Sequence, residues 1–339
     1  MGVRAFLARA QKSRLLSCWL FPLRVLSWFF YLICLVRKRW LLSLRQRRHL
    51  ESLLVTVGNI TVGGTGKTPF IMLLLSHLQC SSAYVSRGYR RREKGLAVGT
   101  GLRAEQIGDE ASLVSRRFPS LLTAVDSCKW KAVQAVDGKV DVIVLDDGLQ
   151  RYDVPRDVEI ATVDCRCPDG YGALLPRGLL REGLSRLENV DYIVLTNADG
   201  ARPRFDRSTI VTRPVIRRFF TPSGQTKELP VGQRVALFSS IAQPEAFATT
   251  IEKLGFDVVD ELCFPDHVDI NEVSLVEYSD RVHARYPNAV LLGTDKDWAR
   301  RESWNGLDVV FSELHLEIIE GQELFEELLG RLNGECRDR

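Results

Sequence analysis

The residues with the clearest chemical potential form a glycine-rich segment at 61–68. It reads Thr-Val-Gly-Gly-Thr-Gly-Lys-Thr and follows an apolar stretch at 53–57. A strand, a glycine-rich turn and a Lys-Thr pair that opens a helix are the layout of a phosphate-binding loop. Such a loop surrounds phosphate oxygens with backbone N–H groups, while its lysine and hydroxyl serve the terminal phosphates and magnesium. We therefore predict that nucleotide is bound by Thr61, Val62, Gly63, Gly64, Thr65, Gly66, Lys67 and Thr68.

One position departs from the strict pattern, which has glycine five residues before Gly66. Thr61 stands there, although the apolar segments on both sides agree with a phosphate-binding loop. Two later segments, 196–199 and 294–297, are similar to the guanine-reading sequence Asn/Thr-Lys-x-Asp. The first lacks the lysine and the second has it one place late. ATP is therefore favoured over GTP.

Two acids follow an apolar stretch at 140–145. A carboxylate at the end of a strand beside a phosphate loop lies where magnesium or its waters bind. We predict this metal role for Asp146, while Asp147 either assists or orients Lys67.

Two further segments carry groups suited to proton transfer. Asp109 opens a predicted helix, so it is either a favourable first-turn acid or a general base, and its spacing alone favours the first alternative. His267 ends the segment Phe-Pro-Asp-His. It is by default a surface-loop histidine, and in a cleft it would tune proton transfer.

Arginines gather in two loops, one containing Arg87 and the other containing Arg181 and Glu182. Either loop is a solvated edge or a grip for an anionic substrate, because guanidinium groups bind phosphate in a bidentate manner.

The chain of 339 residues is 45% hydrophobic and 26% charged, which is ordinary for a globular protein of about two domains. Residues 1–50 hold 11 Lys and Arg and no Asp or Glu, and the rest holds 35 basic and 43 acidic residues. An acidic body argues against a nucleic-acid enzyme and for a basic arm with its own partner. The eight cysteines lack zinc spacing and indicate reduced thiols.

The stretch 15–36 is apolar and aromatic, with Arg24 as its only charge and basic residues on both flanks. Its length allows a spanning helix, but Arg24 and the two basic flanks argue against one. A helix lying in the membrane interface, attracted to anionic lipids, is favoured, and packing on the protein's own core is the alternative.

Strands and helices alternate after residue 51, which indicates an α/β fold with a mainly parallel sheet between helices, plus a second, smaller α/β lobe. We expect a membrane-associating segment at 1–50, a nucleotide-binding core at 51–205, a linker or β-ribbon at 206–233 and a second lobe at 234–339. Strands are expected at 53–57, 83–86, 121–125, 140–145, 158–163, 191–195, 208–219, 234–238, 257–263, 289–293 and 308–312. Helices are expected at 67–79, 109–117, 127–136, 178–187, 244–254, 272–285 and 321–332.

Taken together, these motifs resemble those of the tetraacyldisaccharide 4′-kinase family, the lipid A 4′-kinases. The resemblance covers nearly the whole chain and rests on segments that follow in the family's order: 58–69, 86–89, 108–110, 146–150, 174–182 and 264–267. The loop of that family also departs from the strict pattern at the position of Thr61.

The resemblance implies transfer of the ATP γ-phosphoryl group, with Mg²⁺, to the 4′-hydroxyl of a tetraacylated glucosamine disaccharide 1-phosphate. It implies two lobes joined by a β-ribbon, work at the cytoplasmic face of the bacterial inner membrane, and no obligate protein partner or nucleic acid. Asp109 would be the general base, supported by His267. Lys67, Thr68, Asp146 and Asp147 would serve phosphates and metal, and the expected substrate residues are Arg87, Arg181 and Glu182.

Three residues depart from the family's usual pattern: Arg151 and Val268 stand in place of histidine, and Ala111 in place of proline. They concern substrate positioning and remove no proposed catalytic group. The competing hypothesis is a membrane-targeted regulatory ATPase of the partitioning type. Those proteins carry a signature lysine where this chain has Val62.

Overall fold

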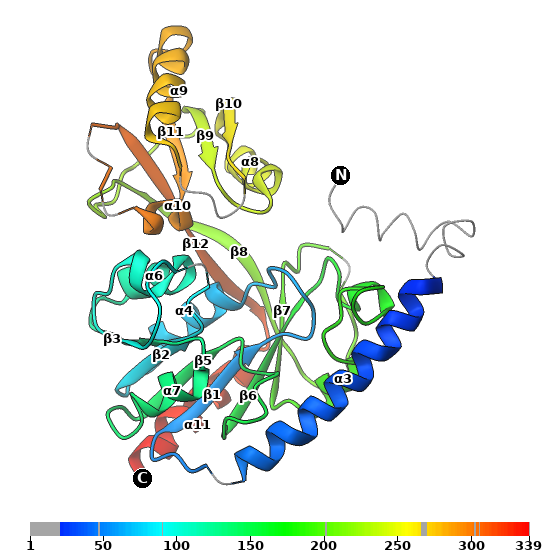
Figure 1. Cartoon of the computed structure of the whole chain (residues 1–339). Helices are drawn as coiled ribbons and strands as arrows, with labels where there is room; N and C mark the ends of the chain where they lie inside the picture. The colour runs from blue at the N-terminus through cyan, green and yellow to red at the C-terminus, as the bar shows by residue number, and fades with distance from the viewer. Residues whose placement is uncertain are drawn as a thin grey trace.

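A single twelve-stranded sheet runs through the molecule in the order β10-β9-β11-β12-β8-β7-β6-β1-β5-β2-β4-β3 (Figure 1). The computed structural model describes residues 21–46, 48–89, 91–200, 202–265, 270–301, 303–304 and 306–338. The strands are β1 (Leu53–Gly58), β2 (Ser82–Ser86), β3 (Ala97–Gly99), β4 (Leu122–Val125), β5 (Val142–Asp146), β6 (Val158–Asp164), β7 (Tyr192–Thr196), β8 (Ile210–Phe220), β9 (Arg234–Ser239), β10 (Asp257–Cys263), β11 (Val290–Thr294) and β12 (Val309–Glu320).

Helices cover both faces of this sheet, as a parallel α/β fold requires (Figure 1). They are α3 (Phe21–Arg45), α4 (Lys67–His77), α5 (Ala104–Ile107), α6 (Asp109–Arg117), α7 (Lys129–Gln134), α8 (Pro244–Lys253), α9 (Glu272–Arg285), α10 (Asp295–Arg300) and α11 (Gln322–Asp338). Two 3₁₀ turns lie at Gly170–Gly172 and Leu184–Asn189. The predicted α/β class with a mainly parallel sheet is confirmed.

The central strands are parallel, with β1 paired to β5 on one side and to β6 on the other. Every residue of β1 and of β5 is buried, which is why both strands read as unbroken apolar runs rather than as alternating patterns. The carboxyl ends of parallel strands meet at one edge. The sheet therefore brings Gly58, Ser86 and Asp146 to the same side.

A long antiparallel pair, β8 with β12, joins the two parallel parts of the sheet (Figure 1). The sequence predicted only the first half of β12, at 308–312. That half is buried, whereas the half beyond Glu313 is mostly half-buried or exposed, as expected for a two-stranded ribbon. We call β9–β11 with α8–α10 the upper part of the molecule, and β1–β7 with α3–α7 and α11 the lower part. The ribbon places α10 of the upper part next to α6 of the lower part.

One predicted helix, at 178–187, is wrong. Only a 3₁₀ turn at Leu184–Asn189 forms there. The backbone N–H groups of Leu179, Leu180 and Arg181 donate instead to Gly170, Ala173 and Ile60. These contacts to other segments replace the bonds within one turn that a helix needs, and amphipathic spacing does not reveal them. The short elements β3, α5 and α10 were not predicted.

Helix α3 lies along the outside of the lower part (Figure 1). Within it only Leu41 is buried. Ser27 Oγ donates to the Leu174 carbonyl at 2.9 Å, and the amide of Arg177 donates to Ser27 Oγ at 3.2 Å. Its exposed large apolar side chains are Phe21, Val25, Leu26, Trp28, Phe29, Tyr31, Leu32, Ile33, Leu35, Val36 and Trp40.

In the described part of the chain, no helix combines the length and the apolarity that crossing a membrane demands.

Asp295 gives a stability prediction. It opens α10, is buried, and accepts a hydrogen bond from the Leu314 amide at 3.1 Å. Burial raises the pKa of its carboxyl to about 6. Between about pH 4 and this value the folded chain holds a proton that the unfolded chain has released, so this carboxyl's contribution to stability falls as the pH rises through that window.

Asp295→Asn keeps an oxygen for the Leu314 amide and cannot ionise. Relative to the unchanged protein, its free energy of unfolding should rise by about 1 kcal/mol between about pH 5 and about pH 7.5, measured by urea denaturation. Asp257→Asn, at an exposed carboxylate of β10, is the control for the loss of one charge. A difference that is constant across this range would contradict the prediction.

Candidate active site

The phosphate loop is held from beneath by buried hydroxyl groups of the neighbouring strands. Thr65 Oγ1 accepts from Asn59 Nδ2 at 2.9 Å and lies 2.8 Å from the Thr162 hydroxyl. Thr196 Oγ1 donates to the Thr65 carbonyl at 2.9 Å. Gly66 adopts φ +77°, and an added Cβ would lie 3.0 Å from Thr196. The loop is therefore fixed in shape before any ligand binds.

The segment 60–62 pairs through its backbone with the segment 179–181, an arrangement that we call the clasp. The Val62 amide donates to the Leu179 carbonyl at 2.8 Å, and the Arg181 amide donates to the Ile60 carbonyl at 2.7 Å. Thr61 sits at the bridge of this pairing, opposite Leu180. The position that breaks the strict loop pattern thus has extended, paired backbone, and glycine's freedom is not needed there.

Asp146 and Asp147 form a sharp turn after β5. Asp147 has φ +52°, in the left-handed region that non-glycine residues seldom adopt. Lys129 Nζ donates to the carbonyl of Asp146 at 2.6 Å and to that of Asp147 at 2.7 Å. Lys129 was not among the predicted site residues, because a lysine in a helix is normally exposed and nothing in its spacing indicates burial. It holds the turn that carries both predicted metal-site acids.

The two carboxyl groups have opposite electrostatic surroundings. Burial raises the pKa of Asp146 to about 6, and the charge of Glu110 adds to this rise. Burial alone would also raise the pKa of Asp147, but Lys67, Lys129 and Arg181 outweigh it and hold that pKa below its ordinary value. Asp147 is therefore ionised at neutral pH, as its contacts to Lys67 Nζ at 3.5 Å and Arg181 Nη1 at 3.0 Å require.

The clasp also brings the Asp-Asp-Gly-Leu-Gln segment, 146–150, against Glu182. Gln150 Nε2 donates to Glu182 Oε2 at 3.1 Å and to the Asn59 carbonyl at 2.9 Å, and the Tyr152 hydroxyl donates to Glu182 Oε1. Two motifs separated by about thirty residues thus meet beside the phosphate loop. Gln150 and Tyr152 were not among the predicted site residues.

The residues around Asp146 suit a magnesium ion. Asp146 Oδ2 accepts from the Tyr84 hydroxyl at 2.9 Å, while its Oδ1 is buried with no hydrogen-bond partner among the described residues. An unpartnered carboxylate oxygen next to a phosphate loop is a fitting ligand for a hard cation. The described residues hold no cage of three or more His, Cys, Asp or Glu. Mg²⁺ needs none where phosphates supply the remaining oxygens.

Asp109 begins α6 and lies where the two parts of the molecule meet. Its Oδ2 lies 3.1 Å from Nε of Arg300, the last residue of α10. Gly108, just before it, has φ +83°, and an added Cβ would lie 2.5 Å from the Tyr89 carbonyl. Only glycine allows the 87–89 loop to approach Asp109 in this way.

The other predicted site residues take no part in the contacts described above. Arg87 follows β2 at the same sheet edge and is exposed. His267, together with the departure Val268, lies outside the described residues. Of the other two departures, Ala111 is buried in α6, and Arg151 pairs with Asp153 at 2.8 Å.

Comparison with known proteins decides the family. Residues 19–333 match the family described as LpxK, tetraacyldisaccharide-1-P 4′-kinase. The chain is 36% identical over 310 residues to the tetraacyldisaccharide 4′-kinase of Neisseria gonorrhoeae, covering 88% of this chain and 87% of that protein. The chain belongs to the tetraacyldisaccharide-1-P 4′-kinase family. The function that goes with this membership is tetraacyldisaccharide 4′-kinase activity in lipid A biosynthesis.

Two further comparisons agree. The enzyme of the same name from Chlorobium luteolum is 33% identical over 283 residues, with 75% of this chain and 78% of that protein covered. A crystal structure of LpxK from Aquifex aeolicus in complex with ATP shares the fold with a TM-score of 0.75 at 23% identity, covering 92% of this chain and 98% of that chain. The resemblance drawn from the motifs is confirmed, and the partitioning ATPase is set aside.

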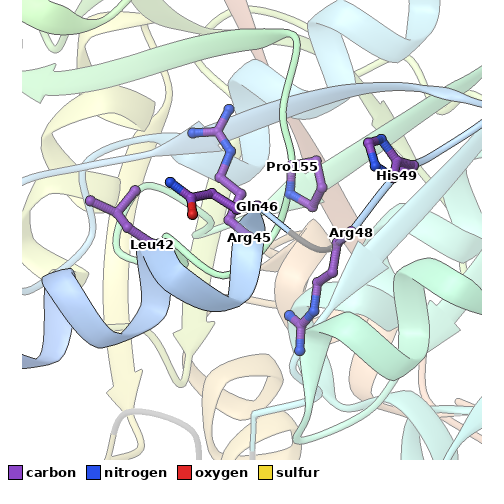
Figure 2. A pocket seen from close by; sticks show the side chains of 6 residues that line it. All are labelled: Leu42, Arg45, Gln46, Arg48, His49 and Pro155. Carbon is purple, nitrogen blue, oxygen red and sulfur yellow. The ribbon is translucent and has the colours of Figure 1, made fainter.

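A cavity of about 420 Å³ lies away from this kinase site, beside the loop that leads into β1 (Figure 2). Its lining includes Arg45, Arg48 and His49. In Figure 2 the Arg48 side chain points away from that of Arg45, and Arg48 is already paired with Asp153 at 2.9 Å. These side chains do not converge on a ligand.

Lys129→Met should destabilise the turn at Asp146 and Asp147. It removes a buried cation that donates to two carbonyl groups, and bonds to charged donors contribute about 1.5–3 kcal/mol each. We expect a clear loss of thermal stability and a smaller rise of the unfolding midpoint with Mg²⁺ and ATP. Lys131→Met, at an exposed position of the same helix, is the matched control. An unchanged ligand-induced shift in Lys129→Met would contradict a positioning role for this residue.

Proposed function

We propose that the protein transfers the γ-phosphoryl group of ATP to the 4′-hydroxyl of a tetraacylated glucosamine disaccharide 1-phosphate at a membrane surface, with Mg²⁺ on the nucleotide. Membership of the family is the basis for the proposed reaction. The observation that carries the site is the convergence, through the clasp, of the phosphate loop with Asp146, Asp147 and Arg181.

The donor side of the site is assigned to residues at one end of the sheet. Backbone N–H groups of 63–68 would surround the β- and γ-phosphates of ATP, with Lys67 as the charge on the transferred group; the predicted Val62 amide is not among them, because it already donates to the Leu179 carbonyl. The ion pair with Asp147 would orient the Lys67 side chain for this role. Thr68 and Asp146 would hold the metal, with Asp147 beside them. Bound Mg²⁺ would neutralise charge that develops on the phosphate oxygens during transfer.

The acceptor side is assigned to Asp109. A carboxylate at the first turn of α6, next to Glu110, whose charge acts on Asp146, suits a base that takes the proton of the attacking hydroxyl. We propose that His267 supports it. Arg87 and Arg181 are the proposed contacts for the negative charge of the substrate, and Glu182 is proposed to orient this part of the cleft.

The membrane contact is assigned to α3. Eleven of its large apolar side chains are exposed, and basic residues are interspersed with them along the helix. A helix of this composition, lying flat in the interface, would keep the enzyme at the surface that holds an acylated substrate. Arg24 and Arg37–Arg39 would meet anionic headgroups on the cytoplasmic face of the inner membrane.

The kinase reaction is tested with labelled ATP and the lipid disaccharide. Asp109→Asn should lower the rate of label transfer by about 10²–10⁴-fold, because general base catalysis contributes that much, and leave ATP binding near normal. Asp206→Asn, at an exposed loop position, is the control. ATP hydrolysis by the unchanged protein without labelled lipid would refute the proposed reaction. Loss of ATP binding in Asp109→Asn would refute only the role of the base.

The membrane contact is tested with vesicles that contain anionic phospholipid. Replacing both Trp28 and Ile33 with alanine should weaken binding by about tenfold or more, since burying one such side chain contributes about 1.5–3 kcal/mol. Val231→Ala, an exposed valine of the upper part, is the control. Equal vesicle binding by all three proteins would exclude α3 as the membrane contact.

A further inference from the structure

The segment Thr294-Asp295-Lys296-Asp297 has no part in the proposed nucleotide chemistry, and the structure gives it a different use. Asp297 is fully buried. Its Oδ2 accepts from the Thr294 hydroxyl at 2.6 Å, and its Oδ1 accepts from the Ser240 amide and from the Ser240 hydroxyl, both at 3.0 Å. These bonds fix the start of α10 to the end of β9.

Arg300 completes this arrangement. Its side chain is 4% exposed and lies 3.3 Å from Asp297 Oδ1. Nη1 donates to the Ser240 carbonyl at 2.7 Å, and Nε donates to Asp109 Oδ2 at 3.1 Å. A guanidinium carries its donors in a rigid planar fork, so anchoring one side of the group fixes the direction of the other.

The rest of α6 is held by the same short helix. Ser112 Oγ donates to the Ala299 carbonyl at 2.8 Å. Arg116 Nη1 donates to the Trp298 carbonyl at 2.6 Å, and its guanidinium lies 4.0 Å from the centre of the Trp298 ring. Asp109, Ser112 and Arg116 are spaced at i, i+3 and i+7 and therefore share one face of α6. All three contact α10.

We infer that Arg300 is a positioning residue for the phosphoryl-transfer reaction: anchored by Asp297 and Ser240, it holds the Asp109 carboxylate in place from the opposite part of the molecule. This inference rests on the proposed role of Asp109 as the base. Catalysis of this kind depends on holding the base in one geometry, and a misplacement of about 1 Å costs on the order of 10²-fold in rate. Arg300 contacts the base and no reacting atom.

The first test compares Arg300→Gln, Arg300→Lys and Arg301→Gln in the labelled-lipid assay with the full chain. Arg301 is the adjacent arginine, and its side chain pairs with Glu272 at 2.6 Å, away from Asp109. We expect Arg300→Gln to lower kcat by about tenfold or more with little change in KM for ATP, Arg300→Lys to retain part of the rate, and Arg301→Gln to match the unchanged protein. Normal kcat in Arg300→Gln would overturn the inference.

The second test separates positioning from folding. In an Asp109→Asn background, Arg300→Gln should lower kcat by less than about twofold, because its effect passes through the carboxylate that is already lost. If the fold-losses of kcat from the two substitutions instead multiply in the double variant, the inference is overturned. Ser112→Ala removes a bond between the same two helices without touching Asp109. It should keep a normal kcat even if it lowers thermal stability as much as Arg300→Gln does. If Arg300→Gln does not fold, Arg300→Lys takes its place in the cycle.

The outcomes also distinguish this inference from the proposed function. A slow Asp109→Asn variant with a normal Arg300→Gln variant refutes the positioning role alone. Undiminished transfer by Asp109→Asn refutes the base, and with it the role of Arg300. Absence of transfer by the unchanged protein refutes both.

Discussion

The clasp between 60–62 and 179–181 is the contact on which the rest of the site depends. Two backbone hydrogen bonds of 2.7 and 2.8 Å join the phosphate loop to a segment more than a hundred residues later in the chain. Because Arg181 is the last residue of the clasp and Glu182 follows it, the same bonds bring Arg181 to Asp147 and Glu182 to Gln150. Helix α3 contacts the residues just before this segment, because Ser27 is hydrogen-bonded to the Leu174 carbonyl and to the Arg177 amide. Helix α3 and the phosphate loop are thus connected by one short stretch of chain, 174–181.

The clasp explains what the sequence did and did not predict. Local patterns are sufficient for the strands of the parallel sheet, because burial on both faces gives long apolar runs. They are also sufficient for the phosphate loop, whose residues are contiguous. The segment 178–187 contains helix-compatible spacing, yet its N–H groups bond to Ile60, Ala173 and Gly170. One of these partners is more than a hundred residues away and the other two lie outside a helical turn, so apolar spacing does not reveal them and the predicted helix there was wrong.

Supporting residues escaped prediction for a related reason. Lys129 and Arg300 have ordinary sequence surroundings, a lysine and an arginine in short helices. Both are almost fully buried in the fold. Lys129 matters because it donates to the carbonyl groups of Asp146 and Asp147, and Arg300 matters because it donates to the carboxylate of Asp109. Motif residues were predictable by type and order, whereas the residues that hold them depend on tertiary packing.

These supporting contacts hold the proposed site residues from two parts of the molecule. The donor acids and Lys67 are fixed within the lower part, by Lys129 and by the clasp. Asp109 belongs to the same part by sequence, but its carboxylate is fixed from above, through Arg300 and the buried Asp297. A shift of α10 relative to the sheet edge would therefore move the Asp109 carboxylate, the proposed base, without acting directly on the phosphate loop. If Asp109 is the base, as proposed, this arrangement would let the enzyme align it with the acceptor without disturbing how the donor is held.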